Sequence, residues 1–474
     1  MVERLRPDLC VIGAGSGGLS VAAAAAQFGV DVVLIERGKM GGDCLNYGCV
    51  PSKALIAAGK RAQTMRESEP FGIKPVEPKI DHRKVHDHVQ AVIAAIAPMD
   101  SVERFTGLGV HVIQAEGRFR DARIVEAGDV EIEARRIVIA TGSSPAVPPV
   151  PGIDEVGYFT NETIFDNTER LPELLVLGGG PIGMELAQAH ARLGSKVTVL
   201  EAFTPLGKDD PELTAVVLKR LAQEGIEILS GAKVDKLERG GKGVMAHITQ
   251  AGAQKIVEGT HLLVAAGRKP NLDALNLDAA GIKYDRTGIA VTPGLKTTNR
   301  RVYAIGDAAG GLQFTHVANY HAGLVIRNAL FRMPVKVSTA AIPWVTYTDP
   351  ELAHVGLTEE QARKAHSGVQ VLRWPYAEND RAQAERKTEG FIKVVVGRKG
   401  RILGATIVGA EAGDLIQPWV LAINNKMKIG AMTGIVVAYP TFAEISKRAA
   451  ITYYLPALTN PWIRRIIRFL RMFG

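Results

Sequence analysis

The chain has few cysteines and no long apolar run, and each shortage excludes a class of protein. Three cysteines among 474 residues cannot hold together a disulfide-stapled secreted domain. No apolar run reaches the ~18 residues that a membrane-spanning helix needs. The alanine-rich stretch 19–30 lacks the basic start and the cleavage site of a signal peptide. We therefore expect a soluble, cytoplasmic protein.

Acidic residues are missing from the C-terminal end, where none follows Glu444. The net charge is +8, and six positive charges lie in the last thirty residues, at Lys447, Arg448, Arg464, Arg465, Arg468 and Arg471. The other 444 residues carry only +2, which gives no support for a surface that binds nucleic acid. We expect no nucleic-acid partner.

The composition is otherwise that of a large globular protein. Apolar residues make up 46% of the sequence and charged residues 22%, which is enough to build several hydrophobic cores. At ~150 residues per domain, the length indicates about three domains. The 50 glycines form no low-complexity tract, and they indicate tight turns and close backbone approaches.

A dinucleotide-binding pattern opens the chain. The apolar run 8–12 leads into Gly13-Ala14-Gly15-Ser16-Gly17-Gly18, a helix-forming stretch follows to about Phe28, and the apolar run 31–35 ends in Glu36. Glycines at this spacing make the turn and let the backbone approach a pyrophosphate, which the helix N-terminus attracts. Glu36, 23 residues after Gly13, is placed to accept hydrogen bonds from a ribose.

The same pattern recurs in the middle of the chain. The run 173–177 leads into Gly178-Gly179-Gly180-Pro181-Ile182-Gly183, and a helix to about Leu193 and a strand at 196–200 precede Glu201. Two such patterns predict two dinucleotides. Because an acidic residue at the Glu201 position binds a ribose 2′-hydroxyl and repels a 2′-phosphate, we predict NAD(H) in preference to NADP(H).

Cys44 and Cys49 follow the first pattern directly, in the segment GGDCLNYGCVPSK at residues 41–53. On one helical turn their Cβ atoms come within disulfide range. Zinc is a poor alternative, because the chain has no second cysteine pair and no histidine nearby. We interpret the pair as redox-active and Cys10, inside the first strand, as a buried thiol. No metal site is predicted.

With these motifs the sequence resembles the class I pyridine nucleotide–disulfide oxidoreductases, which include dihydrolipoamide dehydrogenase, glutathione reductase and mercuric reductase. The resemblance covers nearly the whole chain and implies FAD at the first pattern. Cys44 then corresponds to the interchange thiol that meets the substrate, and Cys49 to the thiolate that contacts the flavin. Lys53 corresponds to the lysine near flavin N5. Glu185 stands where the family has a carboxylate paired with that lysine, although a solvated helix charge is the alternative.

Several further family motifs appear in order along the chain. Asp307 corresponds to the aspartate that binds the flavin ribityl chain, and the segment from Thr315 corresponds to the loop beside the flavin pyrimidine. Asp43 departs from the family, which has threonine there, and a negative charge beside the flavin phosphates needs a compensating donor. The predicted cofactor-binding residues are Gly13, Gly15, Ser16, Gly17, Gly18, Glu36, Arg37, Gly42, Asp43, Lys53, Gly117, Ala140, Thr141, Gly142, Gly178, Gly180, Pro181, Ile182, Gly183, Glu201, Gly267, Arg268, Gly306, Asp307, Phe314, Thr315, His316 and Ala318.

The resemblance implies an α/β fold with two Rossmann-like, doubly wound nucleotide-binding domains and a C-terminal α+β dimerisation domain. We expect the FAD-binding domain at residues 1–150 and 271–340, and the NAD-binding domain at 151–270. The dimerisation domain is expected at 341–474, where the strand-like runs 390–396 and 402–408 alternate with helical segments. The protein is expected to be a homodimer with active sites shared between the chains.

A second departure lies in the C-terminal motif. The family completes each active site with the partner chain's histidine and glutamate, whereas this chain has Tyr439-Pro440-Thr441 followed by Glu444. A tyrosine, with an ordinary pKa of ~10, is a poor base at neutral pH. We count Tyr439 and Glu444 as catalytic residues, but the tyrosine argues against ordinary lipoamide or glutathione turnover. A packing substitution that leaves slow but similar catalysis is the alternative.

The sequence predicts an FAD-dependent NAD(P)H–disulfide oxidoreductase. Electrons would pass between NADH, FAD, the Cys44–Cys49 disulfide and a small or protein-bound disulfide or dithiol. Mercuric reductases also carry tyrosine in the C-terminal motif, but this chain has no C-terminal cysteine pair to hand over the metal, so metal reduction stays an alternative. A membrane-associated NADH:quinone-type oxidoreductase and a non-catalytic redox-sensing flavoprotein are further alternatives.

The last residues, 461–473, have the period of a helix. At about 100° per residue, the four arginines fall within an arc of about 120°, and most apolar residues lie opposite them. A basic amphipathic helix with Trp and Phe is typical of elements that dock on a membrane surface or an acidic partner. A helix packed within its own dimer needs the same pattern. The segment is too short to span a bilayer.

Overall fold

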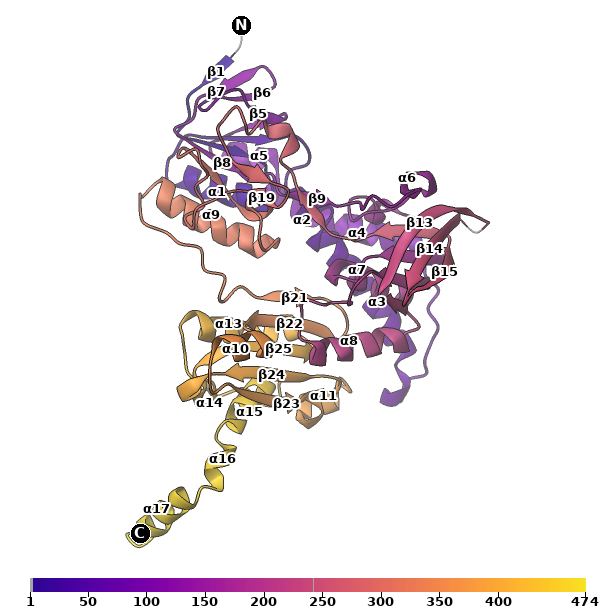
Figure 1. Cartoon of the computed structure of the whole chain (residues 1–474), viewed down its shortest axis with the longest axis vertical. Coiled ribbons are helices and arrows are strands. Elements are labelled where there is room, and N and C mark those ends of the chain that lie inside the picture. The colour runs from indigo at the N-terminus through magenta and orange to yellow at the C-terminus, as the bar shows by residue number, and fades with distance from the viewer. Residues whose placement is uncertain (1–2, 242) are drawn as a thin grey trace. The chain divides into compact units, whose positions relative to one another are not determined.

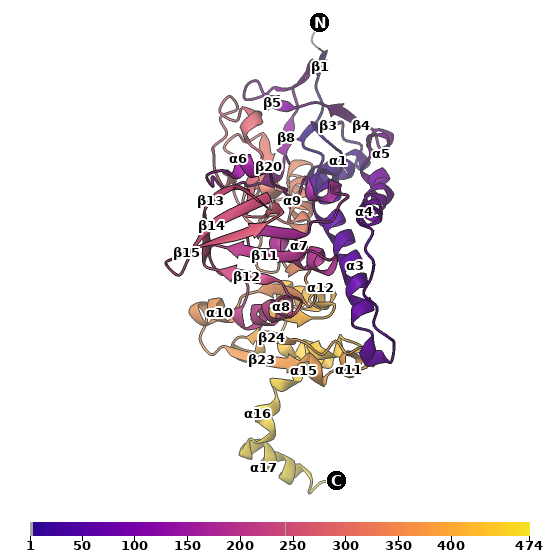
Figure 2. The same ribbon diagram turned by 90° about the vertical axis from the view of Figure 1, so that its right-hand side faces the viewer.

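The computed structural model describes residues 3–241 and 243–474, which form two compact units. One unit contains the chain up to Phe203 together with Glu227–Val337. The other contains Thr204–Ile226 and Ser338–Gly474. Figures 1 and 2 show the elements of each unit in two views.

A parallel five-stranded sheet carries the first glycine motif, with the strand order β20-β8-β2-β3-β4. Its strands are β2 (Leu9–Ile12), β3 (Val32–Glu36), β4 (Val110–Gln114), β8 (Arg136–Ile139) and β20 (Val302–Ala304). Their Val, Ile and Leu side chains are mostly buried, as expected of a parallel sheet that is covered on its faces. Helices α1 (Ser16–Gln27) and α9 (Thr315–Ala329) pack together in the core on one face. Strand β20 thus joins a distant part of the chain to the N-terminal sheet.

A second parallel sheet carries the second glycine motif, with the order β12-β11-β10-β16. Its strands are β10 (Glu173–Leu177), β11 (Lys196–Glu201), β12 (Glu227–Ser230) and β16 (His261–Val264), with helix α7 (Pro181–Arg192) after β10. An antiparallel sheet of β13 (Ala232–Gly240), β14 (Gly243–Gln250) and β15 (Ala253–Gly259) packs beside it. Both motifs therefore lie at the carboxyl ends of parallel strands, where nucleotides bind in such sheets.

Smaller elements complete the first unit. Two helices, α2 (Gly42–Asn46) and α3 (Cys49–Arg66), follow β3 along the chain and contain the two cysteines. The others are β1 (Glu3–Leu5), α4 (His82–Ile96), α5 (Val102–Gly107), β5 (Gly117–Phe119), β6 (Val125–Ala127), β7 (Val130–Ile132), β9 (Ser143–Pro145), α6 (Ile153–Val156), β17 (Arg268–Pro270), β18 (Tyr284–Asp285) and β19 (Gly288–Ile289).

The second unit is built on an antiparallel sheet of order β21-β22-β25-β24-β23. The strands are β21 (Trp344–Thr346), β22 (Glu351–Gly356), β23 (Gln370–Pro375), β24 (Phe391–Val396) and β25 (Ile402–Gly409). The main helices are α8 (Pro211–Gln223), α10 (Glu359–Ala365), α13 (Gln417–Asn424), α14 (Ile429–Gly434) and α15 (Glu444–Thr452). Buried Lys393 ties α8 to this sheet through ion pairs of 2.7 Å to Asp210 and 2.8 Å to Glu212.

Two further helices end the chain, α16 (Leu455–Leu458) and α17 (Pro461–Leu470). Both views show them leading away from α15 and from the sheet of their own unit, at the yellow end of the chain (Figures 1 and 2). Across residues 3–241 and 243–474, no helix combines the length and the apolar character needed to cross a membrane.

The predicted α/β class is confirmed, and the strands around both glycine motifs begin and end within a residue of their expected positions. The two sheets are Rossmann-like in their parallel order and in the glycine turn that precedes each helix. The proposed domain bounds stay predictions.

Candidate active site

Two glycines of the first motif occupy positions where no side chain fits. Gly13 follows β2 with φ +105°, and a Cβ there would lie 2.5 Å from the carbonyl oxygen of Ala140. A Cβ on Gly18 would lie 1.8 Å from the carbonyl oxygen of Gly13. Glycine therefore permits both the turn and the close packing of α1 on β2. The first backbone N–H groups of α1, from Ser16, are left free of intrahelical partners and can bind phosphate.

Glu36 ends β3, and two backbone N–H groups fix its carboxylate beside this turn. Oε2 accepts a hydrogen bond from Ala14 N at 2.6 Å, and Oε1 accepts one from Gly38 N at 2.7 Å. Lone pairs remain on both oxygens for ribose hydroxyls. The neighbouring Arg37 pairs with Glu116 at 3.1 Å.

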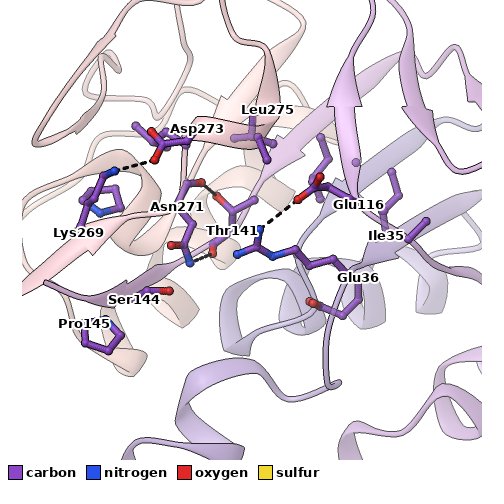
Figure 3. Close-up of a pocket in the computed structure, with 18 residues that line it drawn as sticks. Ile35, Glu36, Glu116, Thr141, Ser144, Pro145, Lys269, Asn271, Asp273 and Leu275 are labelled. Atoms are coloured by element: carbon purple, nitrogen blue, oxygen red, sulfur yellow. Dashed lines mark hydrogen bonds and ion pairs between the residues drawn. The ribbon is translucent and has the colours of Figure 1, made fainter. Parts of the chain in front are cut away.

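A cavity of about 280 Å³ opens at the same place (Figure 3). Thr141 and Asn271 hold one wall, because Thr141 Oγ1 donates to Asn271 O at 2.8 Å and Asn271 Nδ2 donates to Thr141 O at 3.1 Å. The predicted cofactor residues that line the cavity are Gly13, Glu36, Arg37, Gly117 and Thr141. The lining residues that were not predicted include Glu116, Ser144, Pro145, Asn271, Asp273 and Leu275. A concave site bordered by a glycine turn and a fixed carboxylate fits the adenosine half of FAD.

The segment that carries the cysteines passes directly over the first glycine turn. Gly41 N donates to Ala14 O at 2.9 Å. A Cβ on Gly42 would lie 2.7 Å from the Cα of Gly15, so the two backbones are in contact. The segment after Gly42 is thereby held against the edge of the nucleotide site.

Cys44 and Cys49 lie on two different helices. Cys44 is in α2 and Cys49 begins α3. The expectation that both thiols share one helical turn is wrong, because the backbone at Gly48, with φ −120° and ψ −112°, breaks the helix between them. The two cysteines are not bonded in this structure, and the interaction between their thiols shifts their pKa values in opposite directions.

Cys49 is the thiol that its surroundings stabilise as a thiolate. The hydrogen bond from Cys44 is the main cause that lowers the Cys49 pKa to about 6, against the opposing effect of burial. The Thr315 hydroxyl, whose Oγ1 lies 3.5 Å from Cys49 Sγ, and the Lys53 ammonium lower it further. The position at the start of α3 adds the positive end of the helix dipole.

The pKa of Cys44 is shifted in the opposite direction. Its hydrogen bond to Cys49 raises the pKa of the Cys44 thiol, and burial and the Cys49 charge raise it further. The reduced pair therefore keeps one proton on Cys44 and the negative charge on Cys49. The two sulfurs therefore differ in protonation state, with a thiol at Cys44 and a thiolate at Cys49.

Lys53 and Glu185 form an ion pair, with Lys53 Nζ 2.7 Å from Glu185 Oε2. Ser52 Oγ donates to the same carboxylate oxygen at 3.4 Å. Glu185 is only 5% exposed, so it is not a solvated helix charge. Because Lys53 lies one turn after Cys49 on α3, the pair connects the cysteine-bearing helix to α7 of the second motif.

Asp43 has the compensating donors that its charge requires. Arg268 Nη2 lies 3.0 Å from Asp43 Oδ1, and Asn161 Nδ2 donates to the same oxygen at 3.1 Å. Arg268 also donates to Ser143, through Nε to Oγ and Nη2 to O, both at 2.7 Å. Ser143 Oγ in turn donates to Asp307 at 2.5 Å, so a polar chain runs from Asp43 to Asp307.

Two residues that connect to Asp43 and Asp307 in this hydrogen-bond network, Ser143 and Asn161, were not predicted from the sequence. Ser143 directly follows Ala140, Thr141 and Gly142, which are predicted cofactor-binding residues, and could have been included on that ground. Asn161 has no local signal, because its role depends on a contact with Asp43 across 118 residues of sequence. Burial raises the pKa of the Asp307 carboxyl, although the Ser143 hydrogen bond opposes this.

The N-terminus of α9 also borders the first motif. A Cβ on Gly17 would lie 3.2 Å from the Cβ of Ala318, and a Cβ on Gly306 would lie 3.0 Å from the same atom. The rings of Phe314 and His316 stack with centroids 5.2 Å apart, on either side of Thr315. The predicted residues of this segment therefore gather around the first glycine turn and Cys49.

The second motif repeats the geometry of the first. Gly178 has φ +115°, and a Cβ there would lie 2.4 Å from Ala265 O. A Cβ on Gly183 would lie 2.0 Å from Gly178 O. Glu201 Oε2 accepts from Gly179 N at 2.6 Å, and its Oε1 accepts from Phe203 N at 2.7 Å. These residues fit the adenosine and pyrophosphate of a second dinucleotide, with Pro181 and Ile182 in the first turn of α7.

Tyr439 and Glu444 lie in the second unit, whereas the cysteines and both glycine motifs lie in the first. Tyr439 OH donates to Asp380 Oδ2 at 2.8 Å, and this bond raises the pKa of the exposed phenol. The Glu444 charge raises it further. The phenol is therefore a hydrogen-bond donor at neutral pH rather than a base.

No group of three or more metal-ligating side chains occurs in the part of the chain that the structure describes. Cys10 is buried in β2, and burial raises its pKa to about 12. It is therefore an inert thiol, in contrast to the hydrogen-bonded pair.

Comparison with known families gives two matches. The pyridine nucleotide-disulphide oxidoreductase family matches residues 7–322, and the dimerisation domain of that family matches residues 342–450. The two matches leave α16 and α17 outside the family's dimerisation domain.

Individual proteins agree with these matches. A mercuric reductase of Lysinibacillus sphaericus is 34% identical over 449 residues, which are 94% of this chain and 82% of that protein. A dihydrolipoyl dehydrogenase of Geobacillus stearothermophilus is 36% identical over 455 residues, 94% of this chain and 96% of that protein. The copper(II) complex of the HOCl-induced flavoprotein disulfide reductase RclA of Escherichia coli is similar in structure, with a TM-score of 0.84 and 26% identity over 94% of this chain and 99% of that one.

Proposed function

This chain belongs to the pyridine nucleotide-disulphide oxidoreductase family, and from that premise we propose that Cys44 and Cys49 are its redox pair and NADH its electron donor. The protein is an FAD-dependent oxidoreductase that acts on sulfur groups. FAD, when bound, supplies a two-electron carrier between the nicotinamide ring and the disulfide. The observation that supports our assignment is the placement of two unbonded cysteines on the adjacent helices α2 and α3 beside the first glycine motif, with Thr315 Oγ1 3.5 Å from Cys49 Sγ.

We assign the attack on substrate to Cys44. Its sulfur forms a mixed disulfide with one substrate sulfur, and the other substrate sulfur leaves as a thiolate. The Cys44 proton passes to the neighbouring Cys49 thiolate and from there to the departing thiolate. Cys49 then attacks Cys44, the second thiolate leaves and takes a proton from solvent, and the Cys44–Cys49 disulfide forms. Two electrons from NADH restore the dithiol.

Tyr439 and Glu444 have a supporting role in this proposal. The dimerisation domain supports a homodimer, in which these residues of each chain complete the site of the other. Because its single O–H is donated to Asp380, the Tyr439 phenol can accept a hydrogen bond from substrate but removes no proton. Proton transfer therefore falls to the cysteine pair, which explains how the chain works without the family's histidine.

The preference for NADH rests on Glu201. Its two oxygens are fixed by Gly179 N and Phe203 N, so the carboxylate cannot turn away from a ribose bound at the second motif. It accepts hydrogen bonds from a 2′-hydroxyl and repels a 2′-phosphate. A dithiol cycle driven by NADH needs a reducing compartment that supplies the nucleotide, so we place the protein in the cytoplasm.

Reduction of a metal ion is the second candidate function. Tyr439 favours it, because a soft metal bound by two thiolates needs no general base for its reduction. The mercuric reductase relatives and the copper(II) complex of the similar structure point in the same direction. Both functions use the same cysteine pair.

An acceptor screen distinguishes the two. NADH oxidation would be followed with lipoamide, glutathione disulfide, mercuric ion, copper(II) and quinones, on the wild type and on Cys44→Ser. We expect turnover of one disulfide or thiophilic metal that Cys44→Ser abolishes, with weak activity on lipoamide. Rapid lipoamide turnover would contradict the argument from Tyr439, and quinone turnover that survives Cys44→Ser would overturn the redox-pair assignment.

A further inference from the structure

The last helix leaves an entire apolar face uncovered. No residue of α17 is buried, and both views show the helix away from the sheet of its own unit (Figures 1 and 2). Six apolar side chains of the helix are at least partly exposed: Trp462, Ile463, Ile466, Ile467, Phe469 and Leu470. Burying that much apolar surface would be favourable, so an occupant that covers it is expected.

These side chains lie on one side of the helix. At about 100° per residue, the six apolar positions fall within an arc of about 160°, and Arg464, Arg465, Arg468 and Arg471 fall within an arc of about 120° opposite. Trp462 lies in the first turn, which the Asn460 side chain caps by accepting from Trp462 N at 2.9 Å. The Arg465 guanidinium lies 5.7 Å from the centre of the Trp462 ring. The helix thus presents an apolar face and a cationic face.

A second copy of the chain is a poor occupant. The family's dimerisation domain ends at residue 450, before the helix begins. Helices paired through their apolar faces would cover those side chains but would leave the arginines of both copies on the outer faces, with no acidic residue after Glu444 to pair with them. An acidic protein would satisfy the arginines, but it would have to supply a matching apolar groove as well.

A bilayer surface made of anionic lipids offers both environments at once. Acyl chains cover the apolar face, phosphates pair with the arginines, and Trp is favoured at the interface between them. Ten residues span only about 15 Å, so the helix lies in the surface and does not cross it. We propose that α17 is an interfacial anchor that docks this flavoenzyme on an anionic lipid surface. This inference goes beyond the redox function and does not depend on it.

The test is co-sedimentation of the full-length holoenzyme with vesicles of phosphatidylcholine containing or lacking about one third phosphatidylglycerol. We expect binding only to the anionic vesicles, weakened by high salt, with a blue shift of tryptophan fluorescence that Trp462→Phe removes. At about 5-fold in affinity per cationic residue, changing Arg464, Arg465, Arg468 and Arg471 to Gln should weaken binding by at least ~100-fold. Ile466→Ser with Ile467→Ser should also abolish it without changing the charge.

A matched variant controls for net charge. Arg398, Lys399, Lys426 and Lys428 are exposed in the same unit, and changing all four to Gln removes the same charge but should preserve vesicle binding. Equal loss of binding in this variant and in the arginine variant would overturn the proposal. The proposal would also be overturned if the wild type did not bind the anionic vesicles. The same holds if the α17 variants changed the mass of the dimer in solution but left vesicle binding unchanged. Turnover with a water-soluble disulfide should be the same in all variants, so failure of the redox assignment would be seen separately.

Discussion

The two glycine motifs form the same nucleotide-binding turn, but they differ in whether another segment of the chain packs against that turn. In both, a Cβ on the last glycine would meet a carbonyl oxygen at about the same distance, 1.8 Å at Gly18 and 2.0 Å at Gly183. In both, a glutamate at the end of the second strand accepts a backbone N–H at 2.6 Å, from Ala14 or from Gly179. The local sequence therefore reproduces the same geometry twice.

The middle glycine shows the difference. A Cβ on Gly15 would lie 4.0 Å from the Cα of Gly42, in the segment that carries the cysteines, whereas a Cβ on Gly180 would have no described atom within 4 Å apart from those of its own chain neighbours. We infer that the first site retains its nucleotide beneath this segment and that the second exchanges its nucleotide with solvent. On this proposal the same glycine turn binds a resident cofactor at the first motif and a substrate at the second.

The largest effect on activity is expected at Cys44, which lies beside the first glycine motif and has no counterpart at the second. Cys44→Ser should lower disulfide turnover by at least ~10³-fold, because no other group can take its place as nucleophile. NADH oxidation with a one-electron dye should stay within about 2-fold of the wild type, since both nucleotide sites are untouched. Cys10→Ala is the matched control and should leave both the disulfide turnover and the dye-linked NADH oxidation unchanged.

The matched glycines test retention against exchange. Gly18→Ala should lower the flavin content of the purified protein, while Gly183→Ala should keep flavin and raise KM for NADH. Overpacking of about 1–3 kcal/mol corresponds to an increase in KM of roughly 5- to 150-fold. Flavin absorbance per chain and steady-state kinetics measure the two quantities. If both variants lose flavin and neither changes KM, the two sites have not been distinguished correctly.

The two glutamates should separate nucleotide choice from flavin retention. Glu201→Ala removes the charge that repels a 2′-phosphate, so the ratio of kcat/KM for NADH over NADPH should fall by about 10-fold. Glu36→Ala should leave that ratio unchanged and loosen flavin instead. A wild-type enzyme that already prefers NADPH would contradict the role given to Glu201.

The smallest effect is expected at Asp43, whose charge raises the pKa of both thiols. Because the Cys49 pKa is lowered to about 6, the stabilisation of its thiolate is present above the ordinary thiol pKa and is lost as the pH falls through about 6. Asp43→Asn should move that loss to lower pH, and Arg268→Gln, which leaves the Asp43 charge uncompensated, should move it to higher pH. Thiolate absorbance of the NADH-reduced protein measures both shifts, and movement in the same direction would argue against the ion pair.

The sequence predicted the local parts of this site and missed the long-range ones. Glycine spacing and apolar runs determine the turns, strands and helix starts, so both motifs were recognised within a residue or so. The contact of Asp43 with Arg268 joins segments 225 residues apart and depends on how the sheets pack, so the sequence showed only that a donor was needed. The helix break at Gly48 was missed because the spacing of two cysteines is compatible with more than one backbone path.

The central claim is that NADH reduces a disulfide between Cys44 and Cys49, and counting thiols tests it most directly. The oxidised holoenzyme, denatured without reductant, should give one titratable thiol per chain, that of Cys10. After anaerobic reduction with NADH and rapid denaturation it should give three, and Cys44→Ser should show no increase with NADH. A wild-type thiol count that stays constant while the flavin is reduced would contradict the account.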